Sequence, residues 1–290
     1  MKRFQILEPR TVAEASRMLQ EHGDAARIYA GGTELLLVLK ERLLHYDYLV
    51  NIKTIPGLGG IDWDQEAGEV RIGALATHRE IERSPVIAEY VPLLAEVEKK
   101  VANVRVRNVG TLAGNLCFAE PHADPGTVLL LHDARVVLET ATERRELPLA
   151  EFFIDALTVA LEPGEILTEI RVPRTPPGAG AAYTKFGHLE RPMVGVGVLL
   201  QAREGTIIDA RVAVGCAGPT PRRMPEAEEI LRGAALARVE EQLAAAGEAA
   251  AAHCDAVDDL HGTAEYKRHL VQVLVGRVAR QALQRIKPIA

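Results

Sequence analysis

Cysteine is scarce in this sequence of 290 residues, which has only three, at positions 117, 216 and 254. No two of them form a Cys-x-x-Cys pair, and this absence excludes a zinc ribbon or a thioredoxin-type redox site. Because an iron–sulfur cluster takes about four cysteine ligands, we expect neither a cluster nor another metal site on this chain. An odd number of cysteines is more typical of the reducing cytoplasm than of a disulfide framework. The N-terminus also lacks the apolar core of a signal peptide, so we expect a cytoplasmic protein.

Aromatic residues, an excess of basic charge and long apolar runs are also missing. Aromatics make up 4% of the chain, with the single tryptophan Trp63, so a bound flat ring would find little to stack on. The 34 Lys and Arg against 40 Asp and Glu give a net charge of -6, which argues against nucleic-acid binding. The locally basic segment 99–107 is expected to be a solvated face. The apolar runs 126–131 and 194–200 are too short to span a bilayer.

The composition is that of a globular protein, with 48% hydrophobic residues, and the length suits one large domain or two modest ones. A segment rich in proline and glycine, 173–180, divides the chain. Before it, short helices alternate with strands, and helices are expected at 11–23, 34–44, 87–103 and 125–131. After it, the pattern predicts strands at 181–186, 194–203 and 207–215, then helices at 226–232, 234–253 and 265–286.

A first motif places two glycines between an expected strand and an expected helix. Glycines let the backbone approach an anion closely, and the amides at the start of a helix can point at it. On its own this pattern is also typical of a plain strand–turn–helix, because it is neither the GxGxxG fingerprint nor a Walker loop. The residues of the motif are Ala30, Gly31, Gly32, Thr33, Glu34 and Leu35.

A second motif, RNVGTLAGN, follows about eighty residues later, and 110–115 is expected to be a glycine-rich loop. It is either a tight connection or a second binding loop. Two such loops in one domain suggest a ligand with two phosphates, held from two sides. Just beyond, Asp124 precedes Pro125 and is expected to be the N-cap of the next helix.

The two motifs, in this order and at this spacing, resemble the FAD-binding subunit of molybdenum-containing hydroxylases, a family that includes the medium subunit of aerobic carbon monoxide dehydrogenase and the flavin part of xanthine dehydrogenase. The resemblance covers nearly the whole chain. It extends to Glu165–Leu167, to the strand with Lys185, to Val214–Thr220 and to Asp259–Tyr266. One departure is Ala113, which stands where the family usually has a second adjacent glycine and would narrow the loop by one methyl group.

The resemblance implies an α+β fold in two parts. Residues 1–175 would form a two-lobed FAD-binding domain of the vanillyl-alcohol-oxidase (PCMH) type. Residues 178–290 would form a smaller domain like the C-terminal domain of the carbon monoxide dehydrogenase flavoprotein, with a three-stranded antiparallel sheet and helices. The backbone at 30–35 and the second motif would hold the FAD pyrophosphate, the latter through Thr111, Ala113, Gly114 and Asn115.

Four further residues acquire roles from the resemblance. Asp124 matches an aspartate that hydrogen-bonds the cofactor, and Lys185 a lysine near the isoalloxazine, where a cation would stabilise reduced flavin. Ile166 and Leu167 would line a pocket for the adenine or the flavin ring. Each has an alternative: a helix cap for Asp124, a surface lysine for Lys185, and plain core for the two aliphatic residues.

The implied function is electron transfer, with no catalytic side chain or metal on this chain. A partner subunit with a molybdenum-pterin cofactor would oxidise the substrate, and a subunit with 2Fe–2S clusters would pass electrons to FAD here. The complex would be heterotrimeric, and the final acceptor would be NAD, a quinone, oxygen or another carrier. Alternatives are a self-contained flavin oxidoreductase of the same fold, or a nucleotide-binding scaffold without flavin. His122, beside the expected flavin site, is either a proton relay or an ordinary loop residue.

Overall fold

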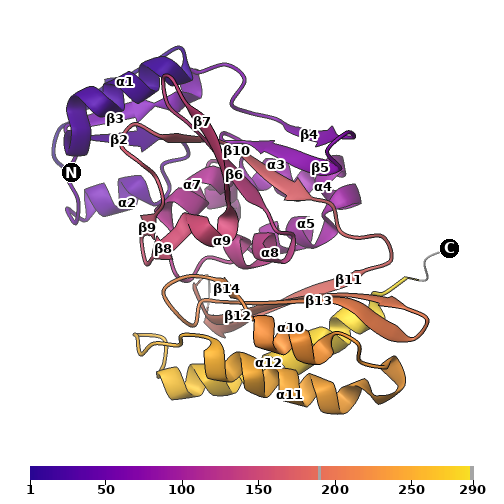
Figure 1. Ribbon diagram of the computed structural model, residues 1–290. Coiled ribbons are helices and arrows are strands. Elements are labelled where there is room, and N and C mark those ends of the chain that lie inside the picture. Colours follow the sequence, from indigo (N-terminus) through magenta and orange to yellow (C-terminus); the bar gives the residue numbers. More distant parts are fainter. Residues whose placement is uncertain (189–190, 288–290) are drawn as a thin grey trace.

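The computed structural model describes residues 1–188 and 191–287, and its N-terminal part is a small parallel lobe (Figure 1). Its three strands run in the order β1 (Gln5–Leu7), β3 (Tyr48–Asn51), β2 (Ala26–Tyr29). The helical elements of the lobe are α1 (Val12–His22), η1 (Gly23–Ala25), α2 (Leu35–Lys40) and η2 (Ile52–Thr54). Helix α1 begins as predicted, since Thr11 Oγ1 accepts a hydrogen bond from the Glu14 amide at 3.1 Å.

The middle of the molecule is a five-stranded antiparallel sheet with the order β4-β5-β10-β6-β7. The strands are β4 (Ile61–Asp64), β5 (Glu69–Gly73), β10 (Ile166–Pro173), β6 (Arg135–Glu139) and β7 (Arg144–Pro148). The short elements around it are α3 (His78–Arg83), α4 (Pro85–Tyr90), α5 (Pro92–Glu98), α6 (Val104–Arg107), α7 (Leu112–Phe118), α8 (Pro125–Leu131), α9 (Leu149–Phe152), β8 (Phe153–Asp155) and β9 (Thr158–Val159). Alternate residues such as Ile72 and Ile170 turn inward and form the main core with these helices.

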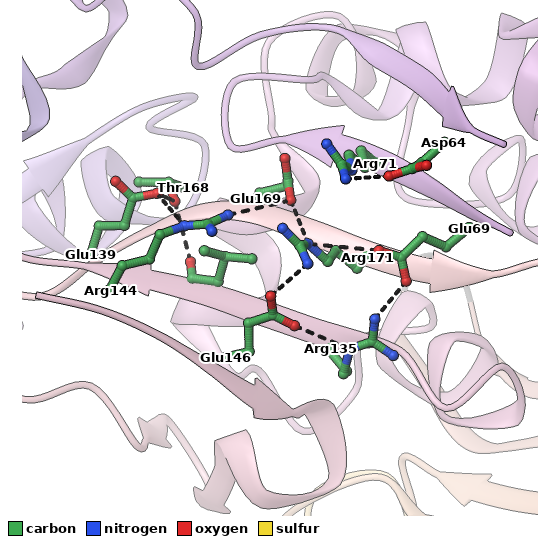
Figure 2. A network of polar contacts seen from close by, with 11 residues as sticks. Asp64, Glu69, Arg71, Arg135, Glu139, Arg144, Glu146, Thr168, Glu169 and Arg171 are labelled. Atoms are coloured by element: carbon green, nitrogen blue, oxygen red, sulfur yellow. Dashed lines mark hydrogen bonds and ion pairs between the residues drawn. The ribbon is translucent and has the colours of Figure 1, made fainter. Parts of the chain in front are cut away.

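The other face of this sheet carries a ladder of charged side chains (Figure 2). Arg171 Nη1 lies 2.5 Å from Glu146 Oε1, and Arg135 Nη2 lies 2.5 Å from Glu69 Oε2. The ladder also includes Asp64, Arg71, Glu139, Arg144 and Glu169. Charges of both signs alternate, so this face is held together by its own ion pairs.

The C-terminal part is a four-stranded antiparallel sheet with helices on one side (Figure 1). The strands are β11 (Gly180–His188), β12 (Arg191–Arg203), β13 (Thr206–Gly215) and β14 (Arg222–Arg223). The helices are α10 (Pro225–Leu231), η3 (Leu236–Arg238), α11 (Val239–His253) and α12 (Ala264–Gln284). Helices α5 and α8 of the middle part pack on one face of this sheet, and α10 and α12 pack on the other. The sheet therefore joins the two halves of the chain.

The α+β class predicted from the sequence is confirmed. The three strands expected after the linker form, and the two-residue strand β14 extends their sheet. Helix α2 ends at Lys40 rather than at residue 44, and Arg42 has a positive φ of 60° that breaks the helical path. No helix in residues 1–188 or 191–287 is long and apolar enough to cross a membrane.

Candidate cofactor-binding site

The two glycine motifs, although far apart in the sequence, touch each other. A Cβ atom added to Gly31 would lie 2.5 Å from the Val109 carbonyl oxygen and 2.7 Å from the Gly110 Cα. A Cβ atom on Gly110 would in turn lie 3.2 Å from Thr33 Oγ1. Both glycines are therefore required by close packing of one motif on the other. The contact makes a single backbone surface out of two sequence segments.

The amides of the first motif remain available on that surface. Within the described parts of the chain, no backbone or side-chain acceptor receives a hydrogen bond from the amides of residues 31–34. Gly32, with φ of 75°, turns the chain between β2 and α2, and its Cβ position is occupied by the Tyr29 ring. Since α2 has only six residues, single N–H groups rather than a long helix dipole would bind an anion here.

The second motif forms a turn followed by the start of a helix. The prediction of a loop at 110–115 is therefore wrong from Leu112 onward. Helix α7 begins at Leu112, and Thr111 caps it by accepting a hydrogen bond from the Gly114 amide at 3.0 Å. Burial of Leu112 in the main core outweighs the low helix propensity of the following glycine and asparagine. The amides of Leu112, Gly114 and Asn115 donate within the protein, so the first helical turn replaces a loop of open amides.

The first turn of α7 has an inner and an outer side. Ala113 is buried in the main core, whereas Gly114 is exposed and Asn115 is half-buried. The extra methyl group of Ala113 therefore packs inward and does not narrow the open side. Gly114 and Asn115 are the residues of this motif that a ligand could reach.

Thr77 and His78 form backbone contacts with the second motif. Thr77 pairs with Thr111 in a short bridge and forms a capping box with Glu80 at the start of α3. The His78 amide donates to the Gly110 carbonyl oxygen at 3.0 Å, and its ring lies 2.6 Å from Glu98 Oε2 in the core. The pair thus positions the backbone at Gly110.

Asp124 lies at the start of α8 but does not cap it, so that prediction is wrong. Its backbone is already helical, with φ of -75° and ψ of -43°, and its side chain makes no cap hydrogen bond. Instead, Asp124 Oδ2 accepts from Lys185 Nζ at 2.6 Å and Oδ1 accepts from the Tyr183 hydroxyl at 2.6 Å. Lys185 Nζ also donates to the Lys100 carbonyl oxygen at 3.0 Å. Lys185 is therefore an anchored cation and not a free surface lysine.

Ile166 and Leu167 begin strand β10 where the N-terminal lobe meets the middle sheet. Ile166 is buried in the core of the lobe and Leu167 in the main core. The structure thus gives both a packing role, and their contact with an adenine or flavin ring stays a prediction.

Several titratable groups gather beside the two motifs. Burial raises the pKa of Glu34, an effect that Arg191 opposes and Glu120 reinforces. Burial also raises the pKa of Cys216 well above its usual range, with a further contribution from Asp124. Cys216 has a φ of 66°, a strained conformation for a residue other than glycine. A recess lies between α7 and the C-terminal part of the chain. It is lined by Asn115, Leu116, Ala119, Glu120, Ala123, Gly126, Phe153, Pro219 and Pro221.

Two polar residues of this region, Tyr183 and Lys267, were not singled out in the sequence. Tyr183 could have been found, since it lies two residues before Lys185 and so shares its face of β11. Asp259 was noted only as the start of a segment that resembles the family, and its pairing with the fully buried Lys267 across a turn had no local signal. Such pairs depend on tertiary packing, which residue spacing alone does not reveal.

Comparison with known proteins adds to this geometry. Residues 2–175 match a family model described as the FAD binding domain in molybdopterin dehydrogenase. Residues 187–282 match a second model, the CO dehydrogenase flavoprotein C-terminal domain.

The similarity extends over almost the full chain. The alpha subunit of the 6-hydroxypseudooxynicotine dehydrogenase complex from Paenarthrobacter nicotinovorans is 33% identical, with 98% of this chain and 96% of that protein covered. The carbon monoxide dehydrogenase medium chain of Hydrogenophaga pseudoflava is also 33% identical, with 98% of both chains covered. A solved structure of carbon monoxide dehydrogenase from H. pseudoflava, lacking the Mo-pyranopterin moiety, superposes with a TM-score of 0.94 at 34% identity over 99% of both chains.

Proposed function

This chain belongs to the family of FAD-binding subunits of molybdopterin dehydrogenases, and on that basis we propose that it takes electrons from 2Fe–2S clusters of a partner subunit onto FAD and passes them to an external acceptor. The family resemblance predicted from the two glycine motifs is confirmed by the matching models and relatives. The observation that carries the proposal is the contact of Gly31 with Val109 and Gly110, which unites the two motifs in one backbone surface beside the unpaired amides of residues 31–34.

The residues present fit an FAD molecule. The amides of residues 31–34 and the side-chain amide of Asn115 in the first turn of α7 offer hydrogen bonds to a pyrophosphate, whose binding needs no aromatic ring. Lys185, held by Asp124, places a fixed cation in the same region, where it would stabilise an anionic ring. When bound, FAD supplies two-electron redox chemistry, and the chain orients it. We propose these contacts together with those of Ile166 and Leu167.

The 2Fe–2S clusters and the molybdopterin would be bound by partner subunits. Among the described residues, no group of histidine, cysteine and acidic side chains is arranged to hold a metal, and the three cysteines are unpaired. We propose a heterotrimer with one subunit for 2Fe–2S clusters and one for molybdopterin, working in the cytoplasm, the compartment that free thiols favour. The relative from P. nicotinovorans is itself named as a subunit of a complex.

Two other functions are tested in the same way. A self-contained flavin oxidoreductase would reduce its FAD with a small molecule and no partner, and a scaffold subunit would bind no flavin. The purified chain is mixed with FAD, separated from free FAD by gel filtration, and its visible spectrum is recorded. The proposed function predicts bound FAD that is reduced by the 2Fe–2S partner and not by organic substrates alone. A chain without flavin bands would overturn it.

A further inference from the structure

His122 lies between two carboxylates that come from opposite halves of the chain. Its Nδ1 is 3.1 Å from Glu120 Oε1, and its Nε2 is 3.1 Å from Asp259 Oδ2. An ionised carboxylate only accepts hydrogen bonds, so both ring nitrogens must donate to satisfy this arrangement. The two carboxylates thus offer one acceptor to each N–H of a doubly protonated ring, the form that carries a proton to give away.

We define the histidine cluster as Glu120, His122, Asp259, His261 and Lys267. Its two carboxylates are held in the ionised form. Against the effect of burial, hydrogen bonds from the Lys267 ammonium and other donors lower the pKa of Asp259 to about 2. The hydrogen bond from His122 lowers the pKa of Glu120. Lys267 is fully buried and also donates to the Ala217 carbonyl oxygen at 3.4 Å. Imidazole is the side-chain type whose unperturbed pKa lies nearest to neutral pH.

A second imidazole connects the cluster with the surface. The His261 ring centroid lies 4.4 Å from that of His122, with the planes tilted by 54°. Asp259 Oδ1 accepts from the His261 amide at 2.8 Å and so holds this turn in place. Because His261 is half-buried, water can reach its ring, which lies beside that of His122.

The cluster adjoins the candidate cofactor site. Glu120 lines the recess together with Asn115 of the second motif. The charge of Glu120 also raises the pKa of Glu34 in the first motif, whereas the charge of Arg191 lowers it. His122 is thus linked through one carboxylate to the region where both motifs meet.

Electron delivery from 2Fe–2S clusters brings no proton, whereas two-electron reduction of FAD consumes at least one. We propose that His122 supplies this proton and recovers it from water through His261, an inference that rests on the function proposed above. In balance, two electrons from reduced 2Fe–2S clusters and one proton from the His122 imidazolium enter FAD. The imidazole left behind is neutral, and it takes a proton from solvent before the next cycle.

The experiment uses the FAD-loaded chain and dithionite, which delivers electrons singly and without a proton. Flavin reduction is followed by stopped-flow absorbance in the wild type, in His122→Ala and in His122→Gln, which preserves hydrogen bonding to the carboxylates. His45→Ala is the matched control, since His45 also pairs with a carboxylate, that of Asp47 at 3.0 Å, and precedes β3 at the end remote from the glycine motifs. FAD affinity is measured for each variant.

We expect both His122 variants to bind FAD and to be reduced about 10-fold more slowly or worse, with added imidazole restoring the rate of His122→Ala. His45→Ala should match the wild type. Unchanged reduction rates, or a slow rate that imidazole does not restore, would overturn the role of His122. Failure of the wild type to bind FAD would instead reject the proposed function, so the two outcomes are distinct.

Discussion

The ammonium of Lys185 and the carboxylate of Asp124 form an ion pair across the two halves of the chain, with Nζ 2.6 Å from Oδ2. Asp124 stands at the start of α8 and Lys185 lies on β11. The same carboxylate accepts from the Tyr183 hydroxyl on that strand, so one buried aspartate anchors two donors. The pair both joins the halves and fixes a cation beside the candidate cofactor site.

We predict that Asp124→Ala destabilises the chain by roughly 1–3 kcal/mol, because it leaves the Lys185 ammonium and the Tyr183 hydroxyl without their acceptor. A double-mutant cycle with Lys185→Met, measured by urea denaturation, should show a clear coupling energy between the two residues. The matched control is Arg285–Glu96, which also links the two halves but is 46% and 45% exposed, and should couple by less than about 1 kcal/mol. Equal coupling in both pairs would contradict this account of Asp124.

Gly31→Ala should weaken both folding and FAD binding. Its methyl group would meet backbone atoms of Val109 and Gly110, which a side-chain rotation cannot relieve. We expect a loss of about 1–3 kcal/mol in the free energy of unfolding, measured with urea, and at least 10-fold weaker FAD binding in a fluorescence titration.

Gly57→Ala is the control for this substitution. Gly57 has a φ of 83° but no described atom within 4 Å of its Cβ position, so an alanine there suffers only from the backbone conformation. It should cost about 1–2 kcal/mol and leave FAD affinity unchanged. An equal loss of FAD affinity in both variants would show that general destabilisation, not the contact of the two motifs, weakens binding.

Stability should fall in acid because of His132. Burial, aided by Arg211, lowers the pKa of this fully buried imidazole to about 3, whereas the unfolded chain has an ordinary histidine. Between the two pKa values only the unfolded state binds the proton, so stability is lost as pH falls from about 6.5 toward 3, by at most about 1.4 kcal/mol per pH unit.

His132→Leu should remove this part of the pH dependence in urea denaturation at a series of pH values. The exposed His253 provides the control, and His253→Leu should keep the wild-type slope. The interpretation of His132 is wrong if its replacement leaves the slope between pH 6 and 4 as it was.

The charged ladder of Figure 2 should contribute unevenly to stability. Arg135 faces Glu69, whose side chain is only 3% exposed, so Arg135→Leu removes the hydrogen bond of a buried carboxylate, leaves it only Arg171 at 3.8 Å, and should cost about 1–3 kcal/mol. Arg144 is 52% exposed and pairs with Glu139 at 3.3 Å, so Arg144→Leu should cost less than about 1 kcal/mol. Thermal or urea denaturation measures both, and equal losses would contradict the importance of burial here.

Local sequence signals predicted the elements that depend on local chemistry. Thr11 caps α1, Pro125 begins α8, and the alternating pattern located β11 to β13. Strands β4 and β7 were missed: β4 has only four residues, two of them aspartates, and in β7 large and charged residues give no apolar face. Both exist because they pair with β5 and β6, a tertiary effect that no short window contains.

The candidate site divides in the same way. The glycine motifs could be recognised in the sequence, but the structural reason for their glycines could not. Gly31 is needed for contact with Gly110, not simply for the approach of an anion. Asp124 was predicted to cap a helix and instead binds Tyr183 and Lys185, since the position of β11 over α8 is set by packing. Residue type indicates what a side chain can do, and its partner is decided by the fold.

The most direct measurement is a crystal structure of the chain with bound FAD. We predict that the pyrophosphate oxygens accept hydrogen bonds from the amides of residues 31–34 and from the side chain of Asn115 in the first turn of α7, and that the flavin ring lies near Lys185. A pyrophosphate bound elsewhere, with the surface formed by Gly31 and Gly110 left empty, would contradict it.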